Sequence, residues 1–208
     1  LFTMRDLNDA NSIGAFMKSG MRLLIVGGGY IGLEAAATAR KFGVDVTLVE
    51  IEERILKRVA AKETSDYIRS LHISNGVNIK EAVGLGKLEI ADDKVLSASL
   101  TDGSDINVDF VIVGIGITPN TELAEGANLK INNGIFINDK CQTSVSNIYA
   151  AGDCTSFEYK DTLVRLESVG NAIDQATIVA QNIMKQNTNY IPKPWFWSDQ
   201  YDLKLQIA

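Results

Sequence analysis

The stretch that decides the fold is Leu23–Glu34, with the sequence LLIVGGGYIGLE. An apolar segment typical of a buried strand runs directly into three glycines spaced G-x-G-x-x-G, which open a helical pattern. A second apolar segment, residues 44–49, follows and ends at Glu50. This order of strand, glycine loop, helix, strand and acid predicts a βαβ unit that holds a dinucleotide by its pyrophosphate and ribose.

Each glycine of the loop has a separate role. Gly27 permits the tight turn out of the strand, Gly29 lets the backbone approach a pyrophosphate, and Gly32 lets the helix pack close to the sheet. The N-terminus of the helix presents free N–H groups and partial positive charge to the phosphates. We prefer this interpretation to a glycine turn without a ligand, because all five features of the βαβ unit occur in series.

Glu50 predicts which dinucleotide is bound. A carboxylate at the end of the second strand can accept hydrogen bonds from both ribose hydroxyls. Its charge would repel a 2′-phosphate, so the sequence favours NAD(H) over NADP(H). Arg54 and Arg58 follow Glu50 and could flank an adenosine, but solvated helix charges are an equally good interpretation of both.

Composition and charge argue against several classes of function. The chain has 208 residues, 46% of them hydrophobic, and a net charge of −6 without a long basic run, which argues against nucleic acid as the main partner. Cys141 and Cys154 form no C-x-x-C pair, so a dithiol redox site is not supported. The one histidine, His72, is expected in an ordinary surface or half-buried position, and no metal site is expected.

No apolar run is long enough to span a bilayer, and no signal peptide is visible. These features predict a cytoplasmic protein that does not bind membranes. Leu1 is not an initiator methionine, so we expect that the true start of the protein lies upstream.

The first part of the chain predicts a parallel sheet with an antiparallel addition. A lead-in helix is expected over residues 6–18, the βαβ unit over 21–50, a helix over 60–74 and a strand over 77–80. Strands are then expected over residues 82–90, 94–100 and 106–113. Asp92-Asp93 and Asp102-Gly103 are the turn signals between them, so they predict a three-stranded antiparallel meander. Its last strand returns into a buried parallel strand at residues 110–113.

The second part of the chain contains no phosphate loop of its own. Short strands are expected over residues 129–131, 134–137 and 148–151, and a long helix over 169–184. The alternating residues 203–207 predict the opening strand of a further domain. The fold class is therefore α/β, a Rossmann-like parallel sheet with a meander, plus part of a second α/β domain.

Five motifs carry a resemblance to a known family. Their sequences are GGGYIGLEAAATARKFG, VIVGIGITPN, IYAAGDC, RLESVGNAIDQA and WFWSDQYDLKLQIA. Together they resemble the NADH-dependent ferredoxin reductases of bacterial oxygenase systems, the putidaredoxin reductase and aromatic-ring dioxygenase reductase family. The first three motifs are shared with the wider pyridine nucleotide-disulphide oxidoreductase superfamily of FAD enzymes, and the last two are more specific.

The resemblance implies a domain arrangement. In that family an FAD domain is interrupted by an NAD domain and followed by a C-terminal interface domain. It implies an NAD-binding domain over residues 1–119, the C-terminal segment of the FAD domain over 120–190, and the start of the interface domain over 191–208. The N-terminal FAD half is missing from this sequence, so we expect a fragment that alone holds FAD weakly and is inactive.

The resemblance also implies a site for NADH. Its binding residues would be Gly27, Gly29, Tyr30, Ile31, Gly32 and Glu50. Gly114, Ile115 and Gly116 would let the backbone approach the nicotinamide end. Glu34, in the first turn of the glycine-loop helix, would lie where nicotinamide meets flavin. An equally good interpretation is a carboxylate favoured by the helix dipole.

A second set of residues would contact FAD. Asp153 would accept a hydrogen bond from the ribityl chain, with a helix cap or turn aspartate as the alternative. Glu167, Ser168 and Val169 would lie beside the isoalloxazine, at a helix N-terminus that could stabilise negative charge on reduced flavin. Trp197 would lie near the flavin edge that faces the ferredoxin, or would anchor the next domain.

The resulting hypothesis is an FAD enzyme that passes electrons from NADH to a [2Fe-2S] ferredoxin. The cofactors carry the chemistry, so no side-chain acid or base is required. The alternatives are a related NADH oxidase, a protein like apoptosis-inducing factor, or a non-catalytic module that only binds NADH. A homodimer is left open.

Overall fold

A computed structural model describes the whole chain, residues 1–208. The chain forms two compact units, one of residues 1–116 with 198–205 and one of residues 117–197 with 206–208. The predicted α/β class, with a parallel sheet and an antiparallel meander, is confirmed. No helix is both long and apolar enough to cross a membrane.

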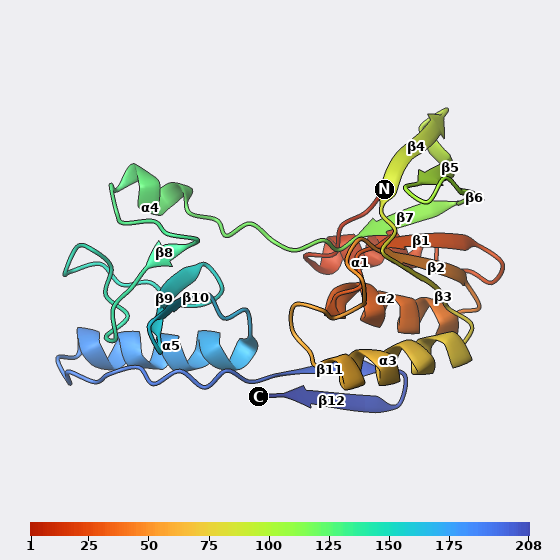
Figure 1. Cartoon of the computed structure of the whole chain (residues 1–208). Coiled ribbons are helices and arrows are strands. Elements are labelled where there is room, and N and C mark those ends of the chain that lie inside the picture. Colours follow the sequence, from red (N-terminus) through yellow and green to blue (C-terminus); the bar gives the residue numbers. More distant parts are fainter. The chain divides into compact units, whose positions relative to one another are not determined.

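The first unit is built on a four-stranded parallel sheet in the order β3-β2-β1-β7 (Figure 1). Its strands are β1 (Arg22–Val26), β2 (Asp45–Glu50), β3 (Asn78–Glu81) and β7 (Phe110–Val113). Val26 is in register with Val49 on one side and Val113 on the other, so the carboxyl ends of these strands meet at one edge. Phe2 adds a parallel bridge to Ile112 beyond β7.

The central strands β1 and β7 are buried on both faces of the sheet, which explains why they are mainly apolar. On β1, Leu23 and Ile25 face a core shared with the helices, whereas Leu24 faces a core shared with the antiparallel sheet. Figure 1 shows the helices α2 (Tyr30–Lys41) and α3 (Lys62–Ser74) on one side of the sheet and the meander on the other.

The lead-in helix, α1 (Leu7–Gly14), is shorter than the predicted range 6–18. It begins after Asp6, whose carboxylate accepts hydrogen bonds from the N–H groups of Asn8 and Asp9. The Asp9 carboxylate accepts the Asp6 N–H in return, so the two acids form a capping box. Asp6 is therefore the cap and not part of the helix.

The meander contains β4 (Leu85–Ala91), β5 (Lys94–Leu100) and β6 (Asp105–Asn107), in antiparallel order. The predicted strand 106–113 is in fact two strands, β6 and β7. The chain changes sheets between them, because Val108 N–H donates to Leu96 O in the meander and Asp109 N–H donates to Arg22 O in the parallel sheet. The predicted turn at Asp92-Asp93 is confirmed, since both residues have positive φ.

The second unit differs more from the prediction. It contains α4 (Glu122–Gly126), β8 (Ile135–Phe136), β9 (Thr155–Tyr159), β10 (Thr162–Val164) and α5 (Val169–Ile183). Two predicted strands, 129–131 and 148–151, are wrong: they contribute only isolated bridges, at Ile131 and Tyr149. The β9–β10 hairpin was not predicted, although Lys160-Asp161 at its turn are both left-handed.

The C-terminal residues form a hairpin of β11 (Phe196–Gln200) and β12 (Leu203–Ile207). Within the first unit, Leu203 and Leu205 pack against the core on the helical side of the parallel sheet. The strand predicted over residues 203–207 is thus confirmed. The predicted domain ranges and the cofactor assigned to each stay predictions, while the boundary between the compact units falls after Gly116.

The sequence suggested a surface or half-buried position for His72, which is wrong: His72 is fully buried on α3. Its Nε2 lies 2.8 Å from Gln200 Oε1, and the Tyr201 hydroxyl lies 3.3 Å from its Nδ1. Because a carbonyl oxygen only accepts, the hydrogen of the neutral ring is on Nε2. This pair of contacts joins the hairpin to α3 and explains how a polar ring is tolerated in the interior.

We predict that His72 makes the protein less stable at acidic pH. Burial lowers the pKa of His72 from its ordinary value of 6.5, and the hydrogen bond to Gln200 offsets part of this effect. The unfolded chain therefore takes up the proton first, so this stability is complete above pH 6.5 and is lost as the pH falls toward the folded-state pKa.

Proton NMR can follow this histidine alone, because the chain has only one. We expect a titration midpoint below 6.5 and a fall in the free energy of unfolding over the same range. The fall should be smaller in His72→Gln, in which the carboxylates still titrate. A midpoint above 6.5 would contradict the buried, neutral state of the ring.

Candidate functional site

The glycine loop lies at the carboxyl edge of the parallel sheet, directly after β1. Gly27 has φ +111°, and a Cβ on it would lie 2.3 Å from the backbone oxygen of Gly114. Gly114 N–H in turn donates to Val26 O at 2.8 Å. Two loops that follow neighbouring strands therefore meet here, backbone against backbone, and only glycine fits at the point of contact.

The other two glycines of the fingerprint have opposite surroundings. A Cβ on Gly32 would lie 2.1 Å from Gly27 O and 3.2 Å from a methyl group of Ile25, so α2 packs against the loop and the strand through this position. A Cβ on Gly29 would have no heavy atom within 4 Å. The loop is therefore closed on the side of the sheet and open at Gly29, where a ligand backbone could approach.

The N-terminus of α2 faces this open position. The helix begins at Tyr30 with Gly29 as its N-cap, and no side chain caps its first turn. Ile31 is 46% exposed, whereas burial raises the pKa of Tyr30 to about 12 and so keeps its hydroxyl protonated. Because the positive end of the helix dipole is not met by a protein carboxylate in this turn, the arrangement is suited to an anion.

Glu50 lies against the glycine loop. Its Oε2 accepts the N–H of Gly28 at 2.7 Å, and its Oε1 accepts the N–H of Glu52 at 2.8 Å. Two backbone donors therefore hold the carboxylate at the end of β2, beside the position where a dinucleotide ribose is predicted. The structure brings Glu50 and the three glycines together, as the sequence suggested.

The two arginines after Glu50 have different surroundings. Arg54 hydrogen-bonds to Ser65 on α3 and, through Nη2, to Lys57 O at 3.4 Å, which favours a structural role. The Arg58 guanidinium lies near the segment Gly114–Gly116, since a Cβ on Gly116 would be 3.8 Å from its Nη1.

The segment Gly114–Gly116, predicted to lie at the nicotinamide end, borders the glycine loop. Gly116 has φ +115°, and the side chain of Ile115 is 71% exposed. A Cβ on Gly114 would lie 3.7 Å from Gly32 N, so this segment also adjoins the start of α2. The carboxyl edge therefore carries every residue predicted for NADH except Glu34.

Glu34 is in the second turn of α2 and not in the first, because the helix begins at Tyr30. This corrects the prediction and weakens the helix dipole as an explanation, because that effect is confined to the first turn. Ser198 Oγ donates to Glu34 Oε1 at 2.6 Å. Ser198 was missed by sequence reasoning, although it belongs to the W-x-W-S-D-Q motif that carries the resemblance.

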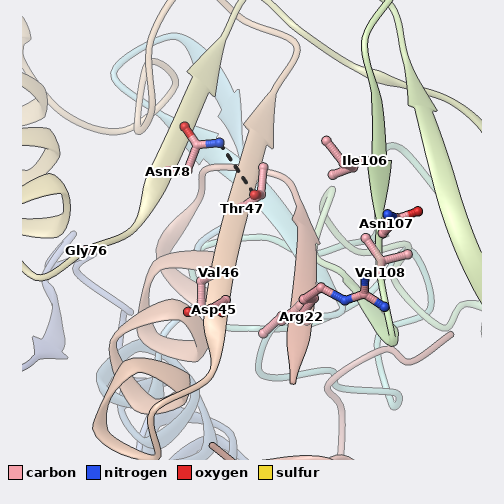
Figure 2. Close-up of a pocket in the computed structure, with 10 residues that line it drawn as sticks. Arg22, Asp45, Val46, Thr47, Gly76, Asn78, Ile106, Asn107 and Val108 are labelled. Carbon is pink, nitrogen blue, oxygen red and sulfur yellow. Dashed lines mark hydrogen bonds between the residues drawn. The ribbon is translucent and has the colours of Figure 1, made fainter. Parts of the chain in front are cut away.

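A hollow of about 360 Å³ lies at the opposite edge of the same sheet (Figure 2). Arg22, Asp45 and Asn78, which begin three of the strands, contribute to its lining. Figure 2 shows the Asn78 amide hydrogen-bonded to Thr47 within it, at 3.5 Å. Because ligands of open α/β sheets bind at the carboxyl ends of strands, this hollow is not the candidate nucleotide site.

In the second unit, a buried glutamine shapes the A-G-D-C turn. Gly152 has φ +92°, and its N–H donates to Oε1 of Gln175 at 2.7 Å. The same oxygen accepts the hydroxyl of Thr155 at 2.9 Å. Gln175 is fully buried on α5, and its Nε2 has no hydrogen-bond partner in the chain. It was not predicted, although it is the glutamine of the NAIDQA motif.

Asp153 follows this turn, and its carboxylate makes no hydrogen bond within the chain. The turn adjoins the start of α5, since a Cβ on Gly152 would be 3.7 Å from Ala172 Cβ. Ser168 is the N-cap of α5, and its hydroxyl accepts the N–H of Asn171 at 3.2 Å. The residues predicted for the ribityl chain and for the flavin ring are thus neighbours in one unit.

The two residues that flank Ser168 differ in their contacts within the chain. Glu167 forms an ion pair with Arg165 at 2.7 Å, so its charge is matched within the chain. Val169, the first residue of α5, is 57% exposed.

Trp197 is exposed and stacked on a second tryptophan. Its side chain is 45% exposed, and its ring centroid lies 5.5 Å from that of Trp195 at an interplanar angle of 34°. Both interpretations of Trp197, at the flavin edge or as an anchor of the next domain, stay predictions.

Both arrangements fit the groups that the sequence predicts. At the first, an open Gly29, an uncapped helix start and a fixed Glu50 carboxylate match a diphosphate and a ribose with free hydroxyls. At the second, the free carboxylate of Asp153 and the unpaired Nε2 of Gln175 are groups that a polyol chain and its surroundings could satisfy. These assignments stay predictions.

Comparison with known proteins identifies the family. Residues 1–176 match the family described as pyridine nucleotide-disulphide oxidoreductase. The chain is 43% identical to the 5,5′-dehydrodivanillate O-demethylase ferredoxin reductase subunit of Sphingobium, over 100% of this chain and 52% of that protein. It is 41% identical to rhodocoxin reductase of Rhodococcus erythropolis, over 99% and 48%. The chain thus spans about half the length of the curated relatives it matches.

A solved structure agrees with these relatives. The crystal structure of the covalent putidaredoxin reductase–putidaredoxin complex matches with a TM-score of 0.92 and 41% sequence identity. The match covers 98% of this chain and 50% of the solved chain. The fold of the whole described chain is therefore that of one half of such a reductase.

We predict that two glycine substitutions in the loop affect different properties, stability for one and ligand binding for the other. Gly32→Ala should lower the free energy of unfolding by about 1–3 kcal/mol, because the added methyl would meet backbone that cannot move aside. Gly29→Ala should change it by less than about 0.5 kcal/mol, since φ is −80° and the space is open. The same methyl should nevertheless weaken ADP-ribose binding about tenfold or more.

Urea unfolding and calorimetric titration of both variants measure these effects. A Gly32→Ala variant as stable as the wild type would refute the close contact between helix and loop. Unchanged ADP-ribose affinity in Gly29→Ala would refute the approach of a pyrophosphate at that glycine.

Proposed function

The chain belongs to the pyridine nucleotide-disulphide oxidoreductase family, and we propose that the full-length protein is an NADH:ferredoxin reductase of an oxygenase system. The observation that carries this proposal is the glycine loop with Glu50 fixed beside it, in a chain 41–43% identical to named ferredoxin reductases. This chain would provide the NADH site and one part of an FAD site.

The residues at the carboxyl edge would bind and orient NADH. Backbone N–H groups at the start of α2, including that of Ile31, would bind the pyrophosphate, and Gly29 would leave room for it. Glu50 would accept the hydroxyls of the adenosine ribose. Gly114–Gly116 would let the nicotinamide half lie against backbone, with Glu34 one turn further along α2.

The residues of the second unit would hold the flavin half of FAD. Asp153 would accept a hydroxyl of the ribityl chain, and Gln175 would keep the turn before it in the required shape. The N-terminus of α5, with Ser168, Val169 and Glu167 around it, would face the ring and stabilise negative charge there. When bound, FAD would supply the chemistry that couples the two-electron hydride donor NADH to a one-electron acceptor.

We also propose a [2Fe-2S] ferredoxin as the electron acceptor. The support is chemical and comparative: Trp197 presents an exposed aromatic surface, and the matched solved structure is a complex of putidaredoxin reductase with putidaredoxin. Aromatic side chains are enriched at the centres of protein interfaces. A cytoplasmic location and a homodimer stay predictions.

Two alternative functions would use the same residues in part. A related NADH oxidase, or a protein like apoptosis-inducing factor, would share both dinucleotide sites but reduce a different acceptor. A module that binds NADH without catalysis would need only the carboxyl edge of the first unit. The identity to named ferredoxin reductases favours the first proposal over both.

The proposal is tested by flavin content and by the electron acceptor. We expect the full-length protein to be yellow, to lose its flavin absorbance on addition of NADH, and to reduce cytochrome c only when a [2Fe-2S] ferredoxin is added. Equal NADH oxidation by oxygen without ferredoxin would indicate an oxidase. A colourless full-length protein that binds NADH would indicate a binding module.

Glu50→Arg tests the preference for NADH. We expect the variant to bind NADH more weakly than the wild type does. It should bind NADPH more tightly, by at least about tenfold, because it replaces repulsion of the 2′-phosphate by a charge-assisted hydrogen bond. Glu53→Arg is the matched control, because Glu53 is exposed and its substitution changes the net charge by the same amount. Calorimetric titration of both nucleotides against both variants provides the measurement, and an unchanged preference in Glu50→Arg would remove Glu50 from the site.

A further inference from the structure

A chain of buried polar side chains leads from α3 to the glycine-loop helix within the first unit. Its members are Tyr201, His72, Gln200, Ser198 and Glu34, and we call it the buried polar chain. His72 and Gln200 are 0% exposed and Ser198 is 1% exposed. Polar groups this deep are costly unless each is hydrogen-bonded, so their presence in a row calls for a physical explanation.

Every hydrogen bond in the buried polar chain points the same way. His72 Nε2–H donates to Gln200 Oε1, and Gln200 Nε2 donates to Ser198 Oγ at 3.0 Å. The Ser198 hydroxyl, having accepted from Gln200, donates to Glu34 Oε1 at 2.6 Å. The direction is imposed by the groups themselves, because the Gln200 carbonyl can only accept and its amide can only donate.

The far end of the chain is also fixed. Burial raises the pKa of Tyr201 to about 12, so its hydroxyl keeps its proton and can donate to Nδ1 of His72. The Nε2–H form of the imidazole is thereby supported from both sides. Because the Ser198 oxygen already accepts a hydrogen from Gln200, its own hydroxyl hydrogen is directed to Glu34.

Glu34 receives this bond on one oxygen only. Its Oε2 makes no hydrogen bond within the chain, and its side chain is only partly buried. A carboxylate with one oxygen fixed by a buried donor and the other free is a directed acceptor for an external N–H or O–H group. Glu34 lies one helical turn after Tyr30, on the helix whose start borders Gly114.

We propose that Ser198 is a positioning residue, which holds Glu34 as a hydrogen-bond acceptor for the nicotinamide half of NADH. This inference rests on the proposed function, because it takes the carboxyl edge of the first unit to be the NADH site. Gln200 and His72 act behind Ser198, by fixing the direction in which its hydroxyl donates. The W-x-W-S-D-Q motif thus contributes to the nucleotide site through its serine and glutamine.

The test compares NADH with ADP-ribose, which lacks only the nicotinamide. Calorimetric titration of the chain with each ligand gives the ratio of the two dissociation constants. We expect Ser198→Ala to weaken NADH binding by about 3- to 10-fold, as for the loss of one hydrogen bond of ordinary strength, and to leave ADP-ribose binding within about twofold. Glu34→Gln should have the same selective effect.

A double-variant cycle shows whether Ser198 acts through Glu34. If it does, Ser198→Ala should weaken NADH binding no further in a chain that already carries Glu34→Gln. Ser156→Ala is the matched control, because Ser156 is equally buried and donates to Asn132 O but belongs to the second unit. It should leave both dissociation constants unchanged. Ser198→Thr, which keeps the hydroxyl, should restore the NADH preference.

The outcomes separate this inference from the proposed function. Equal weakening of both ligands by Ser198→Ala would show a role in the fold of the first unit and would overturn the inference. Additive effects in the double variant would overturn it as well. If the wild-type chain binds ADP-ribose and NADH but Ser198→Ala changes neither, only the inference fails, whereas a wild-type chain that binds neither ligand would overturn both.

Discussion

The structure depends on a backbone contact that excludes every side chain. Gly27 O lies where a Cβ of Gly32 would be, and Gly114 O lies where a Cβ of Gly27 would be. These two contacts bring the end of β1, the start of α2 and the end of β7 together at one edge of the sheet. The sheet beneath is buried on both faces, so it cannot shift to relieve a clash.

The same contact gives the edge its electrostatic character. It aims an uncapped helix start at open space beside Gly29, and it brings Gly28 N–H within reach of the Glu50 carboxylate. A partial positive charge and a full negative charge therefore lie side by side, each at a fixed position. A diphosphate suits the first and a ribose with free hydroxyls suits the second. The hollow at the opposite edge offers neither arrangement.

The sequence allowed us to predict the structure that depends on neighbouring residues. It did not allow us to predict contacts between residues far apart in the chain. β1, α2 and β2 could be predicted because turn, helix and strand signals lie within the stretch from Leu23 to Glu50. Ser198 and Gln200 could not, because their partners Glu34 and His72 are 164 and 128 positions away. His72 was expected at a surface or half-buried position, because periodicity carries no information about a buried amide that could hydrogen-bond to its ring. The strand predicted over 148–151 is wrong, because this segment forms a single isolated bridge, between Tyr149 and Gln142.

The most direct test of this account is to map where ADP-ribose binds, by following backbone amide signals in NMR as the ligand is added to the chain. The account predicts that the largest changes occur at residues 27–33 and at Glu50. Changes confined to the opposite edge, at Arg22, Asn78 and Val108, would contradict it, as would no change at any of the amides of the glycine loop.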